Sequence, residues 1–226
     1  MRFVNRFLSA ISILALSTIC LAAQASVQAP EAGKEYSALK RAQPTESGKK
    51  IEVIEFFAYY CPHCNALEPL LEAWVKKNSD KIVFKRIHVL NPGIETQQKL
   101  FFTLDAMGIA DQYQRKAFEA YHVLHNRLLT DAQIGDFVKQ VGIDKTKFFG
   151  VYNSFTVQTK ISRAQQLTRD YEINSWPTLI IDGRLMTSPS MAVSNIGRVS
   201  EEEQNQAMFP VLDWLISKAQ KEKSAK

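Results

Sequence analysis

The sequence predicts an α/β fold in which a mixed central sheet is flanked by helices and carries an all-helical insertion between its two halves. Three observations lead to this prediction. An apolar strand pattern runs directly into an amphipathic helix that begins at a C-x-x-C tetrad. Helical periodicity without a clear strand then fills residues 94–173, and an Asp-Gly hairpin signal follows it. With 226 residues, 46% of them hydrophobic, the chain is long enough to bury one sizeable core.

Residues 1–25 have the features of a secretory signal peptide. Arg2 and Arg6 precede an apolar centre, the segment contains no acidic residue, and it ends in Ala-Gln-Ala. Removal of this segment would also remove Cys20, so the mature chain would keep two cysteines. We therefore expect residues 26–226 to form the folded domain in an oxidising compartment outside the cytoplasm.

The first half of the predicted sheet comes from two strands. A short edge strand is expected at Tyr36–Leu39, and the nearly apolar Ile51–Phe57 is expected to be a central strand. Glu55 interrupts that run, and the residues alone leave two explanations open: the strand turns toward solvent there, or the acid is buried behind the cysteines. Lys81–Leu90 alternates and predicts the second strand, in which His88 is interpreted as a structural residue with a local hydrogen bond.

The tetrad Cys61-Pro62-His63-Cys64 lies at the junction of strand and helix. Pro62 suits the first helical position, which places Cys61 at the N-cap and Cys64 one turn further in. There the Cys61 sulfur meets unpaired N–H groups and the positive end of the helix dipole, and a hydrogen bond or positive charge from His63 lowers its pKa further. A stabilised thiolate makes the disulfide a strong oxidant, with Cys64 as the resolving thiol.

The same helix has a predicted buried face that follows the tetrad at helical spacing. Its members are Leu67, Leu70, Leu71, Trp74 and Val75. A static disulfide or half of a zinc site are the other readings of a C-x-x-C, but a zinc site needs four ligands and the sequence has no second C-x-x-C. No metal site is therefore predicted.

The helical block at about residues 94–173 is divided by glycines and capping residues, among them Gly108, Gly142 and the pair Thr130 and Gln133. His122 and His125 lie three residues apart on one of these helices, a spacing that can bind metal. No carboxylate or cysteine partner stands out, so they are interpreted as surface residues.

The second half of the sheet follows this block. Thr178–Ile181 and Arg184–Thr187 flank Asp182-Gly183, a strong hairpin signal, and Pro177 stands at the entrance to the first of these strands. A capping box formed by Ser200 and Glu203 predicts the start of a closing helix. The apolar stripe of this helix comprises Met208, Val211, Leu212, Leu215 and Ile216. A βαβ unit followed by ββα is the order of elements in the thioredoxin fold.

Over essentially the whole mature chain the sequence resembles the DsbA-type thiol:disulfide interchange proteins of the bacterial periplasm. The motifs that carry the resemblance are EFFAYYCPHC at 55–64, YNSF at 152–155 and WPTLIIDGR at 176–184. The resemblance implies that Pro177 is a cis-proline beside the tetrad and that Trp176 and Pro177 present backbone to a substrate peptide. It also implies that Glu55 is a buried acid which, with Pro62 and His63, tunes the redox pair.

The function implied is that of a periplasmic dithiol oxidase that donates the Cys61–Cys64 disulfide to reduced, unfolded secreted proteins held in an apolar groove. Its only redox group would be that disulfide, and a DsbB-like, quinone-linked membrane oxidase would restore it. A reductase or isomerase of the same fold is the nearest alternative, and a thiolate metal-binding or chaperone module a more distant one. The net charge of +5 is too small to indicate nucleic-acid binding, and nothing requires more than a monomer.

Three positions depart from the pattern of the family, and one of them, Pro69 inside the helix after the tetrad, matches thioredoxin better than some DsbA proteins. Trp176 is much bulkier than the small or β-branched residue usual before the cis-proline, which bears on substrate preference. Arg86 stands where well-known members have a lysine facing the buried acid. None of the three positions touches the redox chemistry directly.

Overall fold

The computed structural model describes residues 29–225. The predicted signal peptide at residues 1–25 lies outside this range and stays a prediction. Within the range the strands are β1 (Ser37–Ala38), β2 (Ile51–Phe57), β3 (Ile82–His88), β4 (Thr178–Ile181) and β5 (Leu185–Thr187). The helices are α1 (Pro62–Lys77), α2 (Glu95–Ala106), α3 (Ala110–His122), α4 (Asp131–Gln140), α5 (Lys145–Tyr152), α6 (Phe155–Asp170), α7 (Pro189–Ala192) and α8 (Glu201–Ser224).

The five strands form one mixed sheet in the order β1-β5-β4-β2-β3. Strand β2 runs parallel to β3 and antiparallel to β4, so the prediction that it lies inside the sheet is confirmed. The hairpin between β4 and β5 is also confirmed, with positive φ at both Asp182 and Gly183. Gly183 cannot be replaced without movement, because a Cβ there would lie 2.3 Å from the carbonyl oxygen of Gln43.

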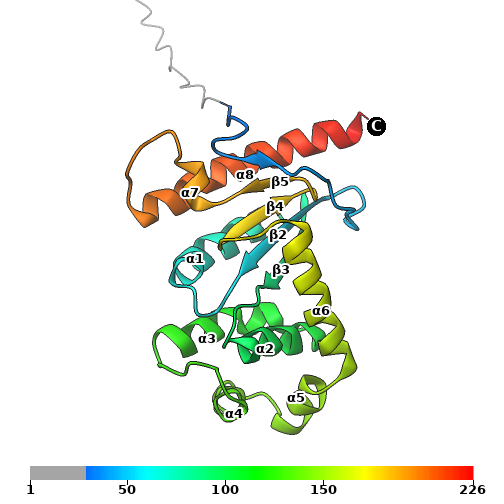
Figure 1. The fold of residues 1–226 in the computed structure, drawn as a ribbon, viewed down its shortest axis with the longest axis vertical. Helices are drawn as coiled ribbons and strands as arrows, with labels where there is room; N and C mark the ends of the chain where they lie inside the picture. The colour runs from blue at the N-terminus through cyan, green and yellow to red at the C-terminus, as the bar shows by residue number, and fades with distance from the viewer. Residues whose placement is uncertain (1–28, 226) are drawn as a thin grey trace, which may run out of the picture.

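Alternate residues of β2 pack into two different cores, as the two-residue period of a strand requires. Ile51 and Val53 pack against α1 and α8 in one apolar cluster. Ile54 and Phe56 pack against the helical insertion, which includes α6, in the other cluster. Figure 1 shows the sheet with α7 and α8 above it and the helical insertion below it. Glu55, two residues after Val53, is thereby directed to the side of α1.

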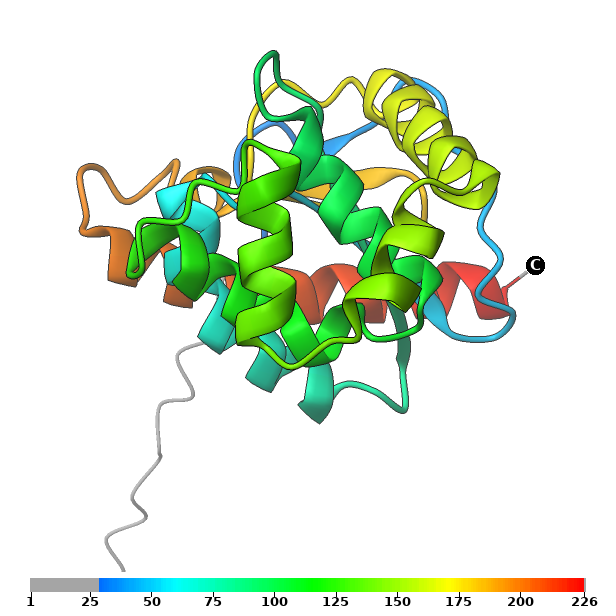
Figure 2. The same cartoon turned by 90° about the horizontal axis from the view of Figure 1, so that it is seen from below.

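The helical insertion comprises α2 to α6, and within the described residues it contains no strand, as predicted. Helices α2 to α5 form a cluster below the sheet, and α6 runs from this cluster back to the sheet (Figures 1 and 2). His125 is exposed, as expected, but it does not share a helix with His122, because α3 ends at His122. His122 is not a free surface residue, since it is half-buried and its Nε2 lies 2.8 Å from the carbonyl oxygen of Tyr59. The interpretation of His122 was wrong because nothing in the helix sequence shows which loop it packs against.

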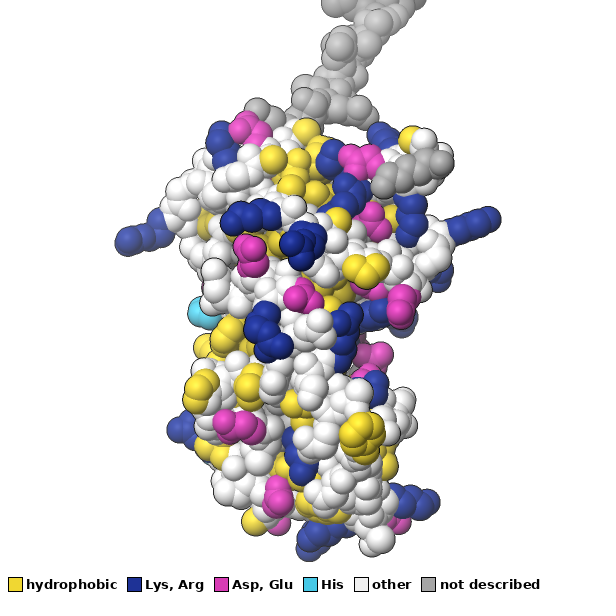
Figure 3. All heavy atoms as spheres, turned by 45° about the vertical axis from the view of Figure 1, so that its right-hand side comes forward, with side chains coloured by type: hydrophobic (Ala, Val, Ile, Leu, Met, Phe, Trp, Pro, Cys, Tyr) yellow, Lys and Arg dark blue, Asp and Glu magenta, His cyan; other side chains and the backbone are white. Residues whose placement is uncertain are grey.

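The closing helix α8 begins at Glu201 behind the predicted capping box of Ser200 and Glu203, and its predicted apolar stripe is buried. The single turn α7 was not predicted, because four residues are too few to show a period. Among residues 29–225 no helix combines the length and hydropathy needed to cross a membrane. On the face seen in Figure 3, basic and acidic side chains are interspersed.

Candidate active site

Both cysteines lie at the first turn of α1, where the sequence placed them. Cys61 is the N-cap with extended backbone (φ −77°, ψ 116°), and Pro62 occupies the first turn. The Cys61 sulfur accepts a hydrogen bond from the backbone N–H of Cys64 at 3.2 Å. A sulfur thus does what a Ser or Asp oxygen does at other helix starts, since it satisfies one of the unpaired donors. Both cysteines are thiols in this structure.

The two thiols have opposite electrostatic surroundings. Hydrogen bonds from the Cys64 thiol and N–H, together with the charge of His63, lower the pKa of Cys61 to about 7. Burial raises the pKa of Cys64 well above its ordinary value, and the neighbouring Cys61 raises it further. Near neutral pH, Cys61 is therefore the thiolate of the pair and Cys64 keeps its proton.

The loop before β4 forms the opposite wall of the site. The Trp176–Pro177 peptide bond is cis, as the resemblance implied. The Cys61 thiol lies 3.6 Å from the carbonyl oxygen of Trp176, to which it donates. The indole of Trp176 meets the ring of Tyr60 edge to face, with 6.4 Å between centroids. A backbone carbonyl from a distant part of the chain is thus held against the reactive sulfur.

A pocket of about 280 Å³ opens beside this wall. It is lined by His63, Ser175, Trp176, Pro177, Ser188, Pro189, Ser190, Glu201, Gln204 and Asn205. Within it the Nδ1 of His63 lies 2.6 Å from a carboxylate oxygen of Glu201, at the start of α8. This contact was not predicted, because the two residues are 138 positions apart.

A cluster of buried charges lies on the other side of the cysteines. Glu55 is fully buried, which settles the alternatives that the sequence left open. Arg86 binds it through Nε at 3.2 Å and reaches two further acids, Glu68 through Nη2 at 2.9 Å and Asp111 through Nη1 at 2.7 Å. Glu68 is also buried, whereas Asp111 is 92% exposed.

One guanidinium cannot neutralise two buried carboxylates. Burial raises the pKa of Glu55, and it raises the pKa of Glu68 to about 8. One oxygen of each, Oε1 of Glu55 and Oε2 of Glu68, has no hydrogen-bond partner among the described residues. Burial of Cys64 next to this acidic cluster keeps its thiol neutral as well, and Glu55 contributes to the rise of the Cys64 pKa.

Glu68 is a buried acid of α1 that was not predicted, although its position in the sequence carries a signal. It lies four residues after Cys64 and so on the same face of α1. That face buries Cys64, Leu67, Glu68, Leu71 and Trp74, whereas the predicted members Leu70 and Val75 are only half-buried. An apolar pattern alone does not identify such a residue, because an acid with a buried partner can occupy a core position.

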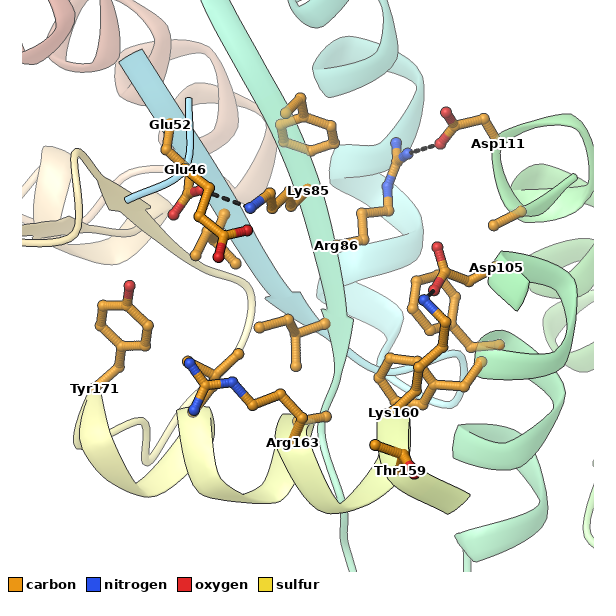
Figure 4. A pocket seen from close by; sticks show the side chains of 18 of the residues that line it. Glu46, Glu52, Lys85, Arg86, Asp105, Asp111, Thr159, Lys160, Arg163 and Tyr171 are labelled. Carbon is orange, nitrogen blue, oxygen red and sulfur yellow. Dashed lines mark hydrogen bonds and ion pairs between the residues drawn. The ribbon is translucent and has the colours of Figure 1, made fainter. Parts of the chain in front are cut away.

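Glu52 is a second buried acid of β2 that was overlooked, and it faces the other side of the sheet. It pairs with Lys85 at 2.6 Å at the border of a larger pocket of about 730 Å³, shown in Figure 4. In the same pocket Lys160 pairs with Asp105 at 2.8 Å, and Arg86 extends toward Asp111. Neither cysteine lines this pocket, and most of its charges are matched within it.

Two histidines hold the backbone that precedes the tetrad. Buried His88 accepts a hydrogen bond from the N–H of Tyr59 at 3.1 Å, while its Nδ1 lies 2.9 Å from the carbonyl oxygen of Val89. Burial lowers the pKa of His88 to about 3, so this ring is neutral. The structural interpretation of His88 is confirmed. His88 binds the N–H of Tyr59 and His122 binds its carbonyl oxygen, so both backbone groups of this residue, two positions before Cys61, are held in place.

The fold and the start of α1 together define a thiol:disulfide oxidoreductase of the thioredoxin-fold class. A family model described as a DSBA-like thioredoxin domain matches residues 81–197, and a thioredoxin model matches residues 41–99. The chain belongs to the DsbA family. It is 38% identical to the thiol:disulfide interchange protein DsbA of Burkholderia cepacia over 213 residues, which is 93% of this chain and 96% of that protein.

Solved structures agree with this assignment. The crystal structure of Pseudomonas aeruginosa DsbA superposes with a TM-score of 0.77 at 32% identity, covering 87% of this chain and 97% of that one. Reduced DsbA1 from Neisseria meningitidis gives a TM-score of 0.73 at 25% identity, covering 88% of this chain and all of that one. The protein is thus a disulfide oxidoreductase that acts by thiol-disulfide exchange.

Proposed function

We propose that Cys61 and Cys64 form the redox-active disulfide that this enzyme donates to proteins. The observation that carries the proposal is the capping of α1 by the Cys61 sulfur, which stabilises the reduced enzyme with a thiolate at that position. A disulfide whose reduced form is stabilised gives up its bridge readily. No bound cofactor is needed beyond the cysteine pair.

The exchange takes place in two displacements. A substrate thiolate attacks the Cys61 sulfur, the Cys61–Cys64 bond breaks, and Cys64 leaves as a thiolate that takes up a proton. A second substrate thiolate then attacks the substrate sulfur of the mixed disulfide and releases Cys61 as the thiolate. Two electrons pass from substrate to enzyme, and Cys61 is the better leaving group because its pKa is the lower one.

The neighbouring residues have distinct proposed roles. Pro62 and His63 shape the helix start and its charge, and Glu55 supplies the acid beneath the pair. Trp176 and Pro177 offer backbone beside the reactive sulfur, where an extended peptide can pair briefly as a strand. The short distance between Cys61 and the Trp176 carbonyl supports this position for the substrate.

The family and the predicted signal peptide support the proposed substrates, partner and compartment. Reduced, unfolded secreted proteins would be oxidised in the periplasm by a monomeric enzyme. A DsbB-like, quinone-linked membrane oxidase would then restore the Cys61–Cys64 disulfide. Such an oxidant is needed because each turnover leaves the enzyme with two extra electrons.

The test is the equilibrium redox potential of the pair against glutathione, followed by the fluorescence of Trp176. We expect a value well on the oxidising side of the glutathione couple. Catalysed oxidation of a reduced, unfolded protein should disappear in Cys61→Ser. A potential near that of thioredoxin would contradict the oxidase proposal and favour a reductase or isomerase.

A further inference from the structure

The first turns of α1 and α8 are joined by one charged contact. His63 is the second residue of α1 and Glu201 is the first residue of α8. Their side chains meet at 2.6 Å between Nδ1 and Oε1, although the two helices belong to opposite ends of the chain. The contact lies at the pocket that borders the reactive cysteine. A carboxylate is therefore placed against the histidine of the redox tetrad.

The position of Glu201 is fixed by the structure around it. Ser200 and Glu203 close a capping box, in which the Ser200 N–H donates to the Glu203 carboxylate at 2.8 Å. Farther along, α8 is anchored to α1 by a hydrogen bond of 2.8 Å from the Trp74 indole to Asp213. Glu201 thus projects from a helix start that cannot rotate freely.

The other two acids of this turn are engaged elsewhere. Glu202 accepts a hydrogen bond from Gln206 at 3.2 Å, and Glu203 is part of the capping box. Of the three consecutive acids, Glu201 is the one that reaches His63. Carboxylates in the first turn stabilise a helix, because they complement the helix dipole. The contact with His63 is made by Glu201 in addition to this general effect on the helix.

We propose that Glu201 is a positioning residue of the redox centre, which holds the His63 ring protonated beside Cys61 and thereby favours the dithiol form of the enzyme. This inference rests on the proposed function and extends it to a residue outside the C-x-x-C tetrad. Glu201 touches neither sulfur, so it acts through His63.

The charges around His63 determine the direction of this effect. The titratable groups that act on its ring are Cys61 from α1 and Glu201 from α8. The hydrogen bond that the ring donates to the Glu201 carboxylate raises the pKa of His63. More imidazolium near neutral pH means a more stable thiolate at Cys61, whose pKa the charge of His63 lowers. The His63 side chain is 67% exposed, so solvent screens the pair and the effect is modest.

The first experiment compares Glu201→Gln with the wild-type protein and with Glu202→Gln. The control removes the same charge one residue further along α8, from a side chain that does not contact His63. For Glu201→Gln we expect the equilibrium with glutathione to shift about threefold toward the enzyme disulfide, which makes it a weaker oxidant. The pKa of Cys61 from ultraviolet thiolate absorbance should rise, and the pKa of His63 from NMR should fall. Glu202→Gln should leave all three values near those of the wild type.

The second experiment repeats the substitution in a His63→Gln background. Because Glu201 acts through the ring, the effect of Glu201→Gln should disappear there. Equal effects of Glu201→Gln and Glu202→Gln, an effect that persists without His63, or a shift toward a stronger oxidant would each overturn the inference. The wild-type potential tests the proposed function, whereas the differences between variants test the role of Glu201, so the two can fail separately.

Discussion

The outer rim of α1, at Cys61 and His63, favours the charged forms of ionisable groups, whereas the underside of the helix, at Cys64 and Glu68, favours their neutral forms. At the rim, N–H donors and His63 stabilise charge, and the pKa of Cys61 falls to about 7. On the underside, burial dominates, and the pKa values of Cys64 and Glu68 rise. Less than two turns of helix separate these environments. The position on the helix, more than the residue type, decides which thiol is reactive.

This comparison also explains why the two sides have different partners. The rim is bounded by backbone groups, which provide partial charges without a counterion, whereas the underside needs the full charge of Arg86 to hold two acids. Removing a group at the rim should therefore change chemistry, and removing one below should change stability. The following predictions test that division, beginning with the largest effect.

The strongest contrast is between Cys64→Ser and Cys61→Ser. In Cys64→Ser the backbone N–H at position 64 and the charge of His63 still lower the pKa of Cys61, and the serine hydroxyl can replace the thiol donor. In Cys61→Ser the remaining Cys64 thiol is completely buried and keeps its proton, because burial raises its pKa. We expect alkylation by iodoacetamide to be faster in Cys64→Ser by about two orders of magnitude. Equal alkylation rates in the two variants would show that the helix end does not distinguish the two sulfurs.

On the underside, Arg86→Met should lower the free energy of unfolding by about 3 kcal/mol, because it leaves Glu55 and Glu68 buried without a cation. Lys160→Met is the matched control, since it breaks the half-exposed pair with Asp105 and should cost less than about 1 kcal/mol. Denaturant unfolding at pH 7 measures both. A loss as small as that of the control would mean that water or rearrangement compensates the buried acids.

Glu68→Gln should change the pH dependence of stability. With a pKa of about 8 in the folded state and 4.5 as its ordinary value, Glu68 keeps its proton in the native protein between these pH values and loses it on unfolding. Its favourable contribution is complete below about pH 4.5 and is lost as the pH rises through about 8. From pH 5 to 8 the wild type should therefore lose about 3.5 kcal/mol relative to Glu68→Gln. Parallel stability curves for the two proteins would place the pKa of Glu68 at its ordinary value.

The smallest effect on the thiols is expected for Trp176→Thr. The contact with Cys61 is made by the backbone carbonyl, which the substitution keeps. The redox equilibrium should therefore change less than about twofold, whereas the kcat/KM for oxidation of a peptide dithiol should fall about threefold as ring contacts are lost. A large shift of the Cys61 pKa would show that the indole itself, rather than the backbone, acts on the sulfur.

The parts of the fold that were predicted correctly depend on local signals. The β4–β5 hairpin follows from Asp182-Gly183, the start of α8 from its capping box, and the N-cap position of Cys61 from Pro62. In each case the physical cause lies within about four residues of the effect. The burial of Glu55 is only partly a local property, because it depends on which face of β2 meets α1. The local pattern left burial and exposure open, and the family resemblance favoured burial.

The contacts that were missed join residues far apart in the chain. Arg86 gathers acids from β2, α1 and α3, and the pair of His63 and Glu201 links two helices 138 residues apart. Periodicity identifies faces of helices and strands, but it does not say which faces meet. His122 illustrates the same limit, because its partner is a loop carbonyl contributed by Tyr59.

The position of β2 between β3 and β4 has a consequence for the assembly of the enzyme during synthesis. Strand β3 and the tetrad are available early, but the carbonyl that faces Cys61 lies 115 residues later in the chain. Closing so long a loop is slow, and the antiparallel register of β2 with β4 forms only after it. Until then the chain carries an unshielded thiol pair and is itself an unfolded protein with free cysteines. A newly made chain therefore resembles a substrate of disulfide formation before it can act as the enzyme.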